Sequence, residues 1–176
     1  MLAAHNAQPA SRLRAYLLVS VDRRNTLAEA QEAVELAARH CSSGGGIVVG
    51  VDLCGDPSRV PVAHLAPAFA RARAAGLKVT LHFAEAAGPA LAQELPLLMG
   101  WWPHRLGHVI HVPLEVREEI VRRSVGVELC LSCNVHAKML VGAAGYEEHH
   151  FGWWKDSGVG VALCVSFSVL VPLLRF

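Results

Sequence analysis

The sequence predicts an α/β fold, a partial (β/α)8 barrel in which parallel strands alternate with helices. Three observations support this prediction. The 176 residues are 53% hydrophobic and 18% charged, which fits buried parallel strands with continuously apolar sequences. Apolar runs recur at intervals of about 30 residues with helical patterns between them, the spacing of repeated βαβ units. Polar residues follow several of these runs, where a barrel presents its functional groups.

Six apolar runs predict six strands. They are expected at 16–21, 47–53, 77–83, 105–110, 125–131 and 158–165. A closed barrel needs eight strands, so the sequence accounts for about three quarters of one. A chain of this length is expected to form a single domain, over residues 1–176.

The helices between the strands have recognisable start and stop signals. Thr26 and Glu29 form a capping box, which predicts a helix from there to about His40. A proline disturbs the third helical pattern at Pro96, and Pro113 is expected at the first position of the fourth helix. The three further helices are expected at 62–75, 89–99 and 113–123.

Charge and cysteine usage restrict the partners and the compartment. The net charge is +1 and no basic run is longer than a pair, which argues against nucleic acid and anionic membranes as partners. Residues 157–174 carry no charge, but two glycines and Pro172 interrupt this run, so we expect no membrane span. Five cysteines with no secretory signal at the start predict reduced thiols and a cytoplasmic protein.

The candidate functional residues follow the ends of four predicted strands. They are Asp22, the segment 52–56, His82 with Glu85, and His108. A neutral imidazole binds zinc, which lowers the pKa of its bound water, and a nearby carboxylic acid can protonate the substrate. An isolated histidine or glutamate at a strand end is more often an ordinary loop residue, and Asp56-Pro57 after Gly55 is a good turn that needs no function. Recurrence at consecutive strand ends nevertheless favours a site.

Two other groups of residues carry weaker signals. Cys130 and Cys133 form a single C-x-x-C motif with no second pair, so a structural zinc site is not expected. A redox motif would start a helix near the front of the chain, so we interpret these thiols as inert groups at a buried strand end. His149 and His150 adjoin aromatic residues such as Trp153, and we expect them to pack a loop against the barrel.

Taken in order, six runs of this sequence resemble the adenosine deaminase-like family, in the branch that acts on N6-methylated AMP. Their spacing follows the family from residue 14 to about 164, and the tail 165–176 is expected to be unrelated sequence. The runs are Val21–Arg24, Val51–Pro57, His82–Glu85, Arg105–His108, Glu128–Asn134 and His149–Gly152.

The resemblance implies a zinc-dependent aminohydrolase that replaces the C6 amine of a purine nucleoside or nucleotide monophosphate, with this chain supplying strands three to eight of the barrel. It implies that His82 binds Zn2+, that Glu85 protonates the purine ring at N1, and that His108 orients the attacking zinc hydroxide. It also implies that Gly55 contacts the purine and that Asp22 faces the substrate. Adenosine, AMP and N6-alkylated AMP remain open as substrates.

The sequence departs from the family at the positions that supply zinc ligands. The His-x-His pair of the family's first strand is not found before Tyr16, and the aspartates expected after Cys164 are replaced by uncharged residues. The glycine that follows the second histidine of the family has become Val109. His82 therefore remains as the one zinc ligand that the resemblance supplies, too few for a catalytic zinc.

These departures predict a truncated form that folds poorly alone and does not deaminate. The alternative is a non-catalytic fragment that binds full-length copies of the enzyme through its unfilled sheet edges. The cytidine deaminase class is set aside, because it needs His-x-Glu and Pro-Cys-x-x-Cys. Here the first spacing is His-x-x-Glu, and Leu129 precedes Cys130.

Overall fold

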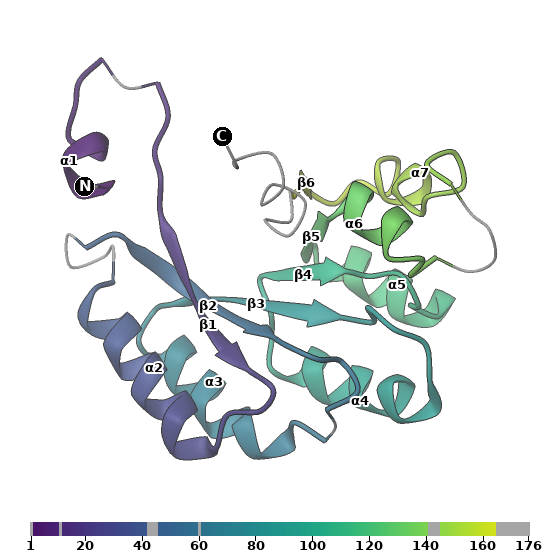
Figure 1. Ribbon diagram of the computed structural model, residues 1–176, viewed down its shortest axis with the longest axis horizontal. Coiled ribbons are helices and arrows are strands. Elements are labelled where there is room, and N and C mark those ends of the chain that lie inside the picture. The colour runs from purple at the N-terminus through teal and green to yellow at the C-terminus, as the bar shows by residue number, and fades with distance from the viewer. Residues whose placement is uncertain (1, 11, 42–45, 60, 141–144, 165–176) are drawn as a thin grey trace, which may run out of the picture. The chain divides into compact units, whose positions relative to one another are not determined.

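The computed structural model describes residues 2–10, 12–41, 46–59, 61–140 and 145–164. In these ranges six strands alternate with helices, and the order of the strands in the sheet is their order in the chain, β1 to β6 (Figure 1). The strand pairs with a described register are all parallel. The predicted α/β fold with six parallel strands is therefore confirmed. The chain divides into two compact units, Met1–Leu81 with Pro96–Pro103 and His82–Leu95 with His104–Phe176.

The first unit is built around three parallel strands and the helices that follow the first two. Helix α2 packs against β1, β2 and α3, and apolar side chains such as Val34, Val51 and Phe69 are fully buried there. Phe69 stacks on Trp101 with ring centroids 4.7 Å apart. The elements are α1 (Leu2–Asn6), β1 (Leu17–Asp22), α2 (Leu27–Arg39), β2 (Val48–Cys54), η2 (Ala63–Leu65), α3 (Ala66–Ala74) and β3 (Lys78–Phe83).

The second unit holds the end of β3, the remaining strands and four helices, of which α4 runs into the first unit at Pro96. Its buried side chains include Leu106, Ile120 and Trp154, all with no exposed surface. The elements are α4 (Pro89–Gly100), β4 (Arg105–His108), α5 (Leu114–Arg122), β5 (Gly126–Leu129), α6 (Leu131–His136), α7 (Phe151–Trp154) and β6 (Val161–Leu163).

The local signals at the helix ends are confirmed in part. The side chain of Thr26 accepts from the N–H of Glu29, and the Glu29 carboxylate accepts from the N–H of Thr26, which is the predicted capping box. Helix α4 continues through Pro96 to Gly100. Pro113 is the N-cap of α5 and not its first helical residue, because its ψ of 158° is extended although its φ of −61° suits a helix.

Three predicted strands are longer than the observed ones by at least two residues. The run at 105–110 gives a strand that ends at His108. The run at 125–131 gives a strand that ends at Leu129, because Leu131 already begins α6. The run at 158–165 gives β6 only over Val161–Leu163, and Val165 lies outside the described residues, as does the tail 165–176. In the ranges that the structure describes, no helix is both long and apolar enough to cross a membrane.

Candidate active site

Three of the predicted site residues meet at the ends of β3 and β4. His82 lies near the end of β3, Glu85 follows that strand, and His108 is the last residue of β4. The rings of His82 and His108 lie with their centroids 5.1 Å apart. Nε2 of His108 is 3.5 Å from Oε1 of Glu85. The carboxyl ends of these neighbouring strands thus place two imidazoles and a carboxylate within reach of one small molecule.

Two backbone hydrogen bonds join these strand ends beyond the regular sheet. The N–H of Val109 donates to the carbonyl of Phe83 at 3.0 Å, and the N–H of His111 donates to that of Ala84 at 2.9 Å. Three residues at these strand ends have positive φ angles, 51° at Ala84, 65° at His108 and 47° at Val109. Strain of this kind costs about 1–3 kcal/mol per residue and is greatest for a β-branched side chain. A glycine in place of Val109 would relieve it.

A chain of buried polar side chains supports His108 from behind. Nδ1 of His108 lies 3.0 Å from Oδ1 of the Asn134 side-chain amide, and Nδ2 of that amide lies 3.2 Å from Nε2 of His149. The backbone N–H of Phe151 then donates to Nδ1 of His149 at 3.0 Å. The exposed fractions of His108, Asn134 and His149 are 5%, 0% and 4%. Each imidazole in this chain is therefore oriented by a hydrogen bond away from water.

The donors in this chain determine where the imidazole protons lie. Burial lowers the pKa of His149, so its ring is neutral, and since Nδ1 accepts from Phe151 the proton must be on Nε2. That N–H needs an acceptor, which is Oδ1 of Asn134 once the amide is oriented with its oxygen toward His149. With Nδ2 toward His149, N–H would be set against N–H, so we assign the amide the reverse orientation, with its oxygen toward His149 and its nitrogen toward His108. The amide N–H2 then donates to Nδ1 of His108, which places the His108 proton on Nε2, facing Glu85.

His150 ties the following segment to the end of β4. Its Nε2 donates to the carbonyl of His108 at 2.6 Å, and its ring stacks on that of His149 with centroids 4.2 Å apart. Burial lowers the pKa of His150 to about 4, against the opposing effect of its hydrogen bond to His108. These contacts fit the packing role that the sequence predicts for this pair of histidines.

The other two predicted site residues lie together in the first unit. Asp22 ends β1 and Gly55 follows β2, with φ +102° at the glycine. A Cβ at Gly55 would lie 2.8 Å from Oδ1 of Asp22, so only glycine fits beside this carboxylate. Arg24 donates two hydrogen bonds to the Asp22 carboxylate, from Nε to Oδ1 at 2.9 Å and from Nη2 to Oδ2 at 2.8 Å. These hydrogen bonds lower the pKa of Asp22 to about 2. Asp22 is therefore a fixed anion.

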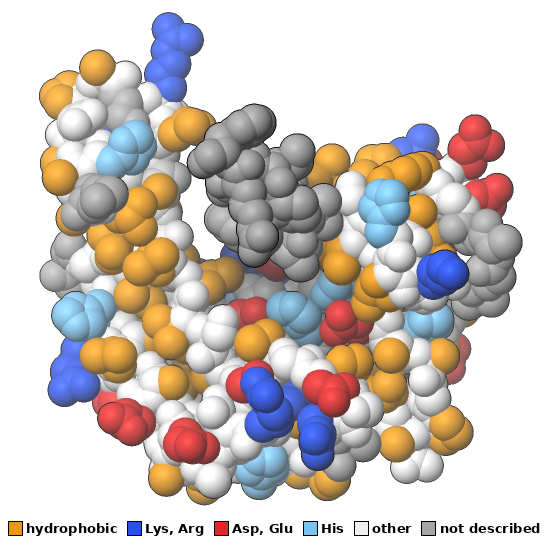
Figure 2. All heavy atoms as spheres, viewed as in Figure 1, with side chains coloured by type: hydrophobic (Ala, Val, Ile, Leu, Met, Phe, Trp, Pro, Cys, Tyr) orange, Lys and Arg blue, Asp and Glu red, His pale blue; other side chains and the backbone are white. Residues whose placement is uncertain are grey.

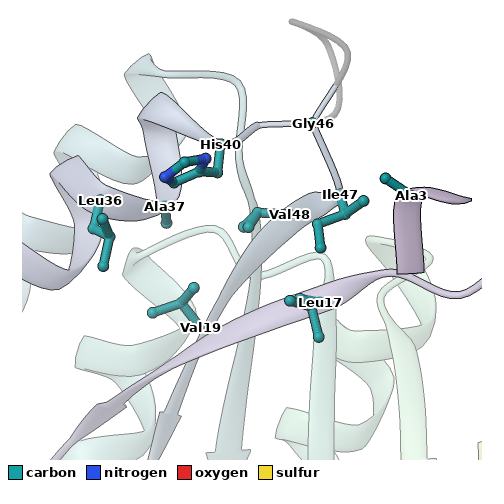
Figure 3. A pocket seen from close by; sticks show the side chains of 9 residues that line it. All are labelled: Ala3, Leu17, Val19, Leu36, Ala37, His40, Gly46, Ile47 and Val48. Atoms are coloured by element: carbon teal, nitrogen blue, oxygen red, sulfur yellow. The ribbon is translucent and has the colours of Figure 1, made fainter. Parts of the chain in front are cut away.

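The first unit also contains an apolar cavity that is distinct from these residues. It has a volume of about 480 Å³ and lies between α1, α2, β1 and β2, with side chains such as Leu17, Leu36 and Ile47 around it (Figure 3). None of the predicted site residues lines it. Figure 2 shows further hydrophobic side chains on the surface. In the first unit, Leu13 and Tyr16 are more than half exposed. Of the nine described residues that line the cavity, His40 is the one with a polar side chain.

The described residues do not form a metal site by themselves. No group of three or more histidine, cysteine, aspartate or glutamate side chains is arranged to hold a metal ion in the part of the chain that the structure describes. His82, the predicted zinc ligand, lies beside His108, whose Nε2 proton faces Glu85. A catalytic zinc needs three protein ligands.

The sequence interpretation missed Asn134 and misplaced the C-x-x-C motif. In the sequence Asn134 is only the last residue of the run Glu128–Asn134, and its role depends on contacts that no local pattern shows. Cys130 does follow the end of β5 directly, but the prediction that the two thiols are buried and do not start a helix is wrong. Cys130 is the N-cap of α6 and both thiols are partly exposed, because the chain turns into a helix directly after β5.

Comparison with known proteins identifies the family. The family model described as adenosine deaminase matches residues 2–165, a longer match than the sequence motifs predict. The chain belongs to the adenosine deaminase family. The N6-methyl-AMP deaminases of Danio rerio and Homo sapiens are each 33% identical to it over 153 residues, 84% of this chain. The chain spans about 42% of the length of these relatives.

Solved structures of the family share its fold. A crystal structure of the Arabidopsis N6-mAMP deaminase is 31% identical with a TM-score of 0.77, and the match covers 89% of this chain and 45% of that one. The Arabidopsis ADAL protein complexed with IMP is 30% identical with a TM-score of 0.76, over 89% of this chain and 44% of that one. The predicted partial (β/α)8 barrel of this family is therefore confirmed.

The proton on His108 can be located by NMR. We expect His108 and His149 both to carry their proton on Nε2 at neutral pH, because the N–H of Phe151 and the amide of Asn134 occupy the two Nδ1 atoms. Long-range proton–nitrogen correlation of the imidazoles distinguishes the two tautomers.

An Asn134→Asp variant is the matched comparison. A carboxylate in place of the amide can only accept, so the proton of His108 should move to Nδ1. A wild-type spectrum with the His108 proton on Nδ1 would contradict the assigned network.

The buried histidines predict a loss of stability in mild acid. The unfolded chain protonates His150 near its ordinary pKa of 6.5, whereas the folded chain does so only at about 4. This contribution to the free energy of unfolding is complete above pH 6.5 and is lost as the pH falls from there to about 4. Urea unfolding at a series of pH values measures it.

His150→Gln keeps a donor for the carbonyl of His108 and removes the titration, so its stability should fall less over this range. His64→Gln, at an exposed histidine, should follow the wild type. An unchanged pH profile in His150→Gln would count against the role of burial.

Proposed function

We propose that this chain carries the acid–base residues of a purine aminohydrolase, which hydrolyses the amine at C6 of adenosine- or N6-methyl-AMP-type substrates. The observation that carries the proposal is the meeting of His82, Glu85 and His108 at the ends of β3 and β4. Membership of the adenosine deaminase family supports it. Because the chain spans less than half of its relatives, the activity of the whole enzyme is part of the proposal.

Each residue has a role that its contacts support. Glu85, in its protonated form, donates to N1 of the purine, which draws electrons from C6 and opens it to attack by water. His108, with its proton on Nε2, donates a hydrogen bond to the oxygen of the attacking water and holds it in place. A histidine in this tautomer orients the nucleophile and does not take its proton. Ammonia or methylamine then leaves from C6.

Within the first unit, Gly55 and Asp22 are each suited to contact a substrate. Gly55 has no side chain, so the face of a purine can approach its backbone closely. Asp22, fixed as an anion by Arg24, is an acceptor for a hydroxyl or ring N–H of the substrate. A purine nucleoside monophosphate is supported as the ligand by the ADAL protein complexed with IMP.

Zinc is part of the proposal for the whole enzyme and not for these residues alone. His82 would supply one ligand and zinc would supply the polarised water. The described donor set falls short of a site, so we derive no step through the metal and expect the 176-residue chain alone not to deaminate. This shortfall also favours the second candidate function, a non-catalytic partner of full-length copies.

We propose that the protein is cytoplasmic, because its odd number of cysteines suits a reducing compartment.

Binding of IMP to the purified chain tests the substrate contacts. We expect calorimetry to detect binding to the wild type and a lower affinity in Gly55→Ala, because the new Cβ would press on Asp22 at 2.8 Å. Gly100→Ala is the matched control, since nothing lies within 4 Å of a Cβ there and its φ is not positive. No binding to a folded wild type, or equal losses in both variants, would count against a purine site.

Turnover tests the catalytic proposal. We expect no loss of N6-methyl-AMP, followed by ultraviolet absorbance, with the purified chain in the presence or absence of zinc, because the ligand set is incomplete.

Zinc-dependent turnover would overturn that expectation and the non-catalytic alternative together. Glu85→Gln should then reduce the rate about 10²–10⁴-fold, the usual loss of a general acid. Glu118→Gln, on the exposed face of α5, should not. Equal rates in the two variants would exclude Glu85 as the acid.

A further inference from the structure

Two cysteines lie side by side at the ends of neighbouring strands. Leu129 of β5 pairs with Leu163 of β6, and Cys130 and Cys164 are the next residue on each chain segment. The N–H of Cys164 donates to the carbonyl of Leu129 at 2.9 Å, which continues the pairing to this point. Neighbouring strands lie about 4.8 Å apart, and disulfides join Cα atoms about 4.4–6.8 Å apart. The backbone spacing therefore suits a disulfide without a large movement.

The two thiols already contact each other. Their side chains form a hydrogen bond, and both residues are partly exposed. The hydrogen bond from Cys130 lowers the pKa of Cys164, against the opposing effects of burial and of Glu128, and the same contact raises the pKa of Cys130. Cys164 is thus the sulfur that ionises first, and Cys130 is the neighbouring thiol that stays protonated.

We propose that Cys130 and Cys164 are an oxidisable thiol pair, which closes to an intrachain disulfide across β5 and β6 when it meets hydrogen peroxide. The Cys164 thiolate attacks one peroxide oxygen, the O–O bond breaks, and hydroxide leaves and takes up a proton as water. The sulfur of Cys130 gives up its proton and attacks the resulting sulfenic acid, the S–O bond breaks, and a second water leaves. The two thiols lose two electrons and the peroxide gains them.

The competing bridge would join Cys130 to Cys133, its partner in the C-x-x-C motif. Cys133 lies in the first turn of α6, and its charge affects Cys130, but the hydrogen bond of Cys130 goes to Cys164. Cys41 and Cys54 belong to the first unit and provide unrelated thiols for comparison. The proposal does not depend on the proposed function, because it concerns only the pairing of two strand ends.

Oxidation of the wild-type chain tests the pair without any substitution. After treatment with one equivalent of hydrogen peroxide, we expect the count of free thiols to fall from five to three. Peptide mapping under non-reducing conditions should recover a cross-linked peptide that contains Cys130 and Cys164. Its mass should be lower than that of the two separate peptides by two hydrogen atoms, and dithiothreitol should restore both.

Matched variants locate the pair. Cys164→Ser and Cys130→Ser should each lose the intrachain link, whereas Cys133→Ser and Cys54→Ser should retain it. A cross-link of Cys130 to Cys133, a link only between chains, or five thiols that oxidise independently would each overturn the proposal. The wild-type peptide map decides the outcome even if a variant fails to fold.

Discussion

The parallel pairing of the strands is the constraint on which the candidate site depends. In a parallel sheet every strand ends at the same edge, so residues far apart in the sequence come together there without any special loop. The site residues His82 and His108 meet in this way at β3 and β4, and so do Cys130 and Cys164 at β5 and β6. The extra hydrogen bond from Val109 to Phe83 fixes the first of these meetings at the cost of a strained backbone.

The buried amide of Asn134 converts this geometry into a chemical preference. It lies between the imidazoles of His108 and His149 and can satisfy both only in one orientation, which in turn favours the proton of His108 on the nitrogen that faces Glu85. A histidine held in this way is a hydrogen-bond donor toward Glu85. In the proposed reaction the acid role would therefore fall to Glu85, and the distinction between the two residues would arise from a buried amide outside the proposed site.

The sequence was informative where a signal is local. The capping box of Thr26, the six apolar runs and the polar residues after them involve neighbours in the chain, and the structure confirms the strands within a few residues. Asn134 could not be recognised in this way, because its partners His108 and His149 lie 26 and 15 residues away in sequence. The helix that begins at Leu131 was missed because an apolar run after a strand looks the same as a continuation of that strand.

The same argument explains why acid–base geometry and metal binding can separate in one chain. A barrel distributes its functional residues over the ends of several strands. The contact of Glu85 with His108 needs only β3 and β4, whose ends are joined by their own hydrogen bonds, so it exists in this chain. A catalytic zinc site needs three protein ligands at once, and the affinity for zinc falls steeply when any of them is missing. His82 can thus remain in place, oriented beside His108, while the described residues lack a metal site.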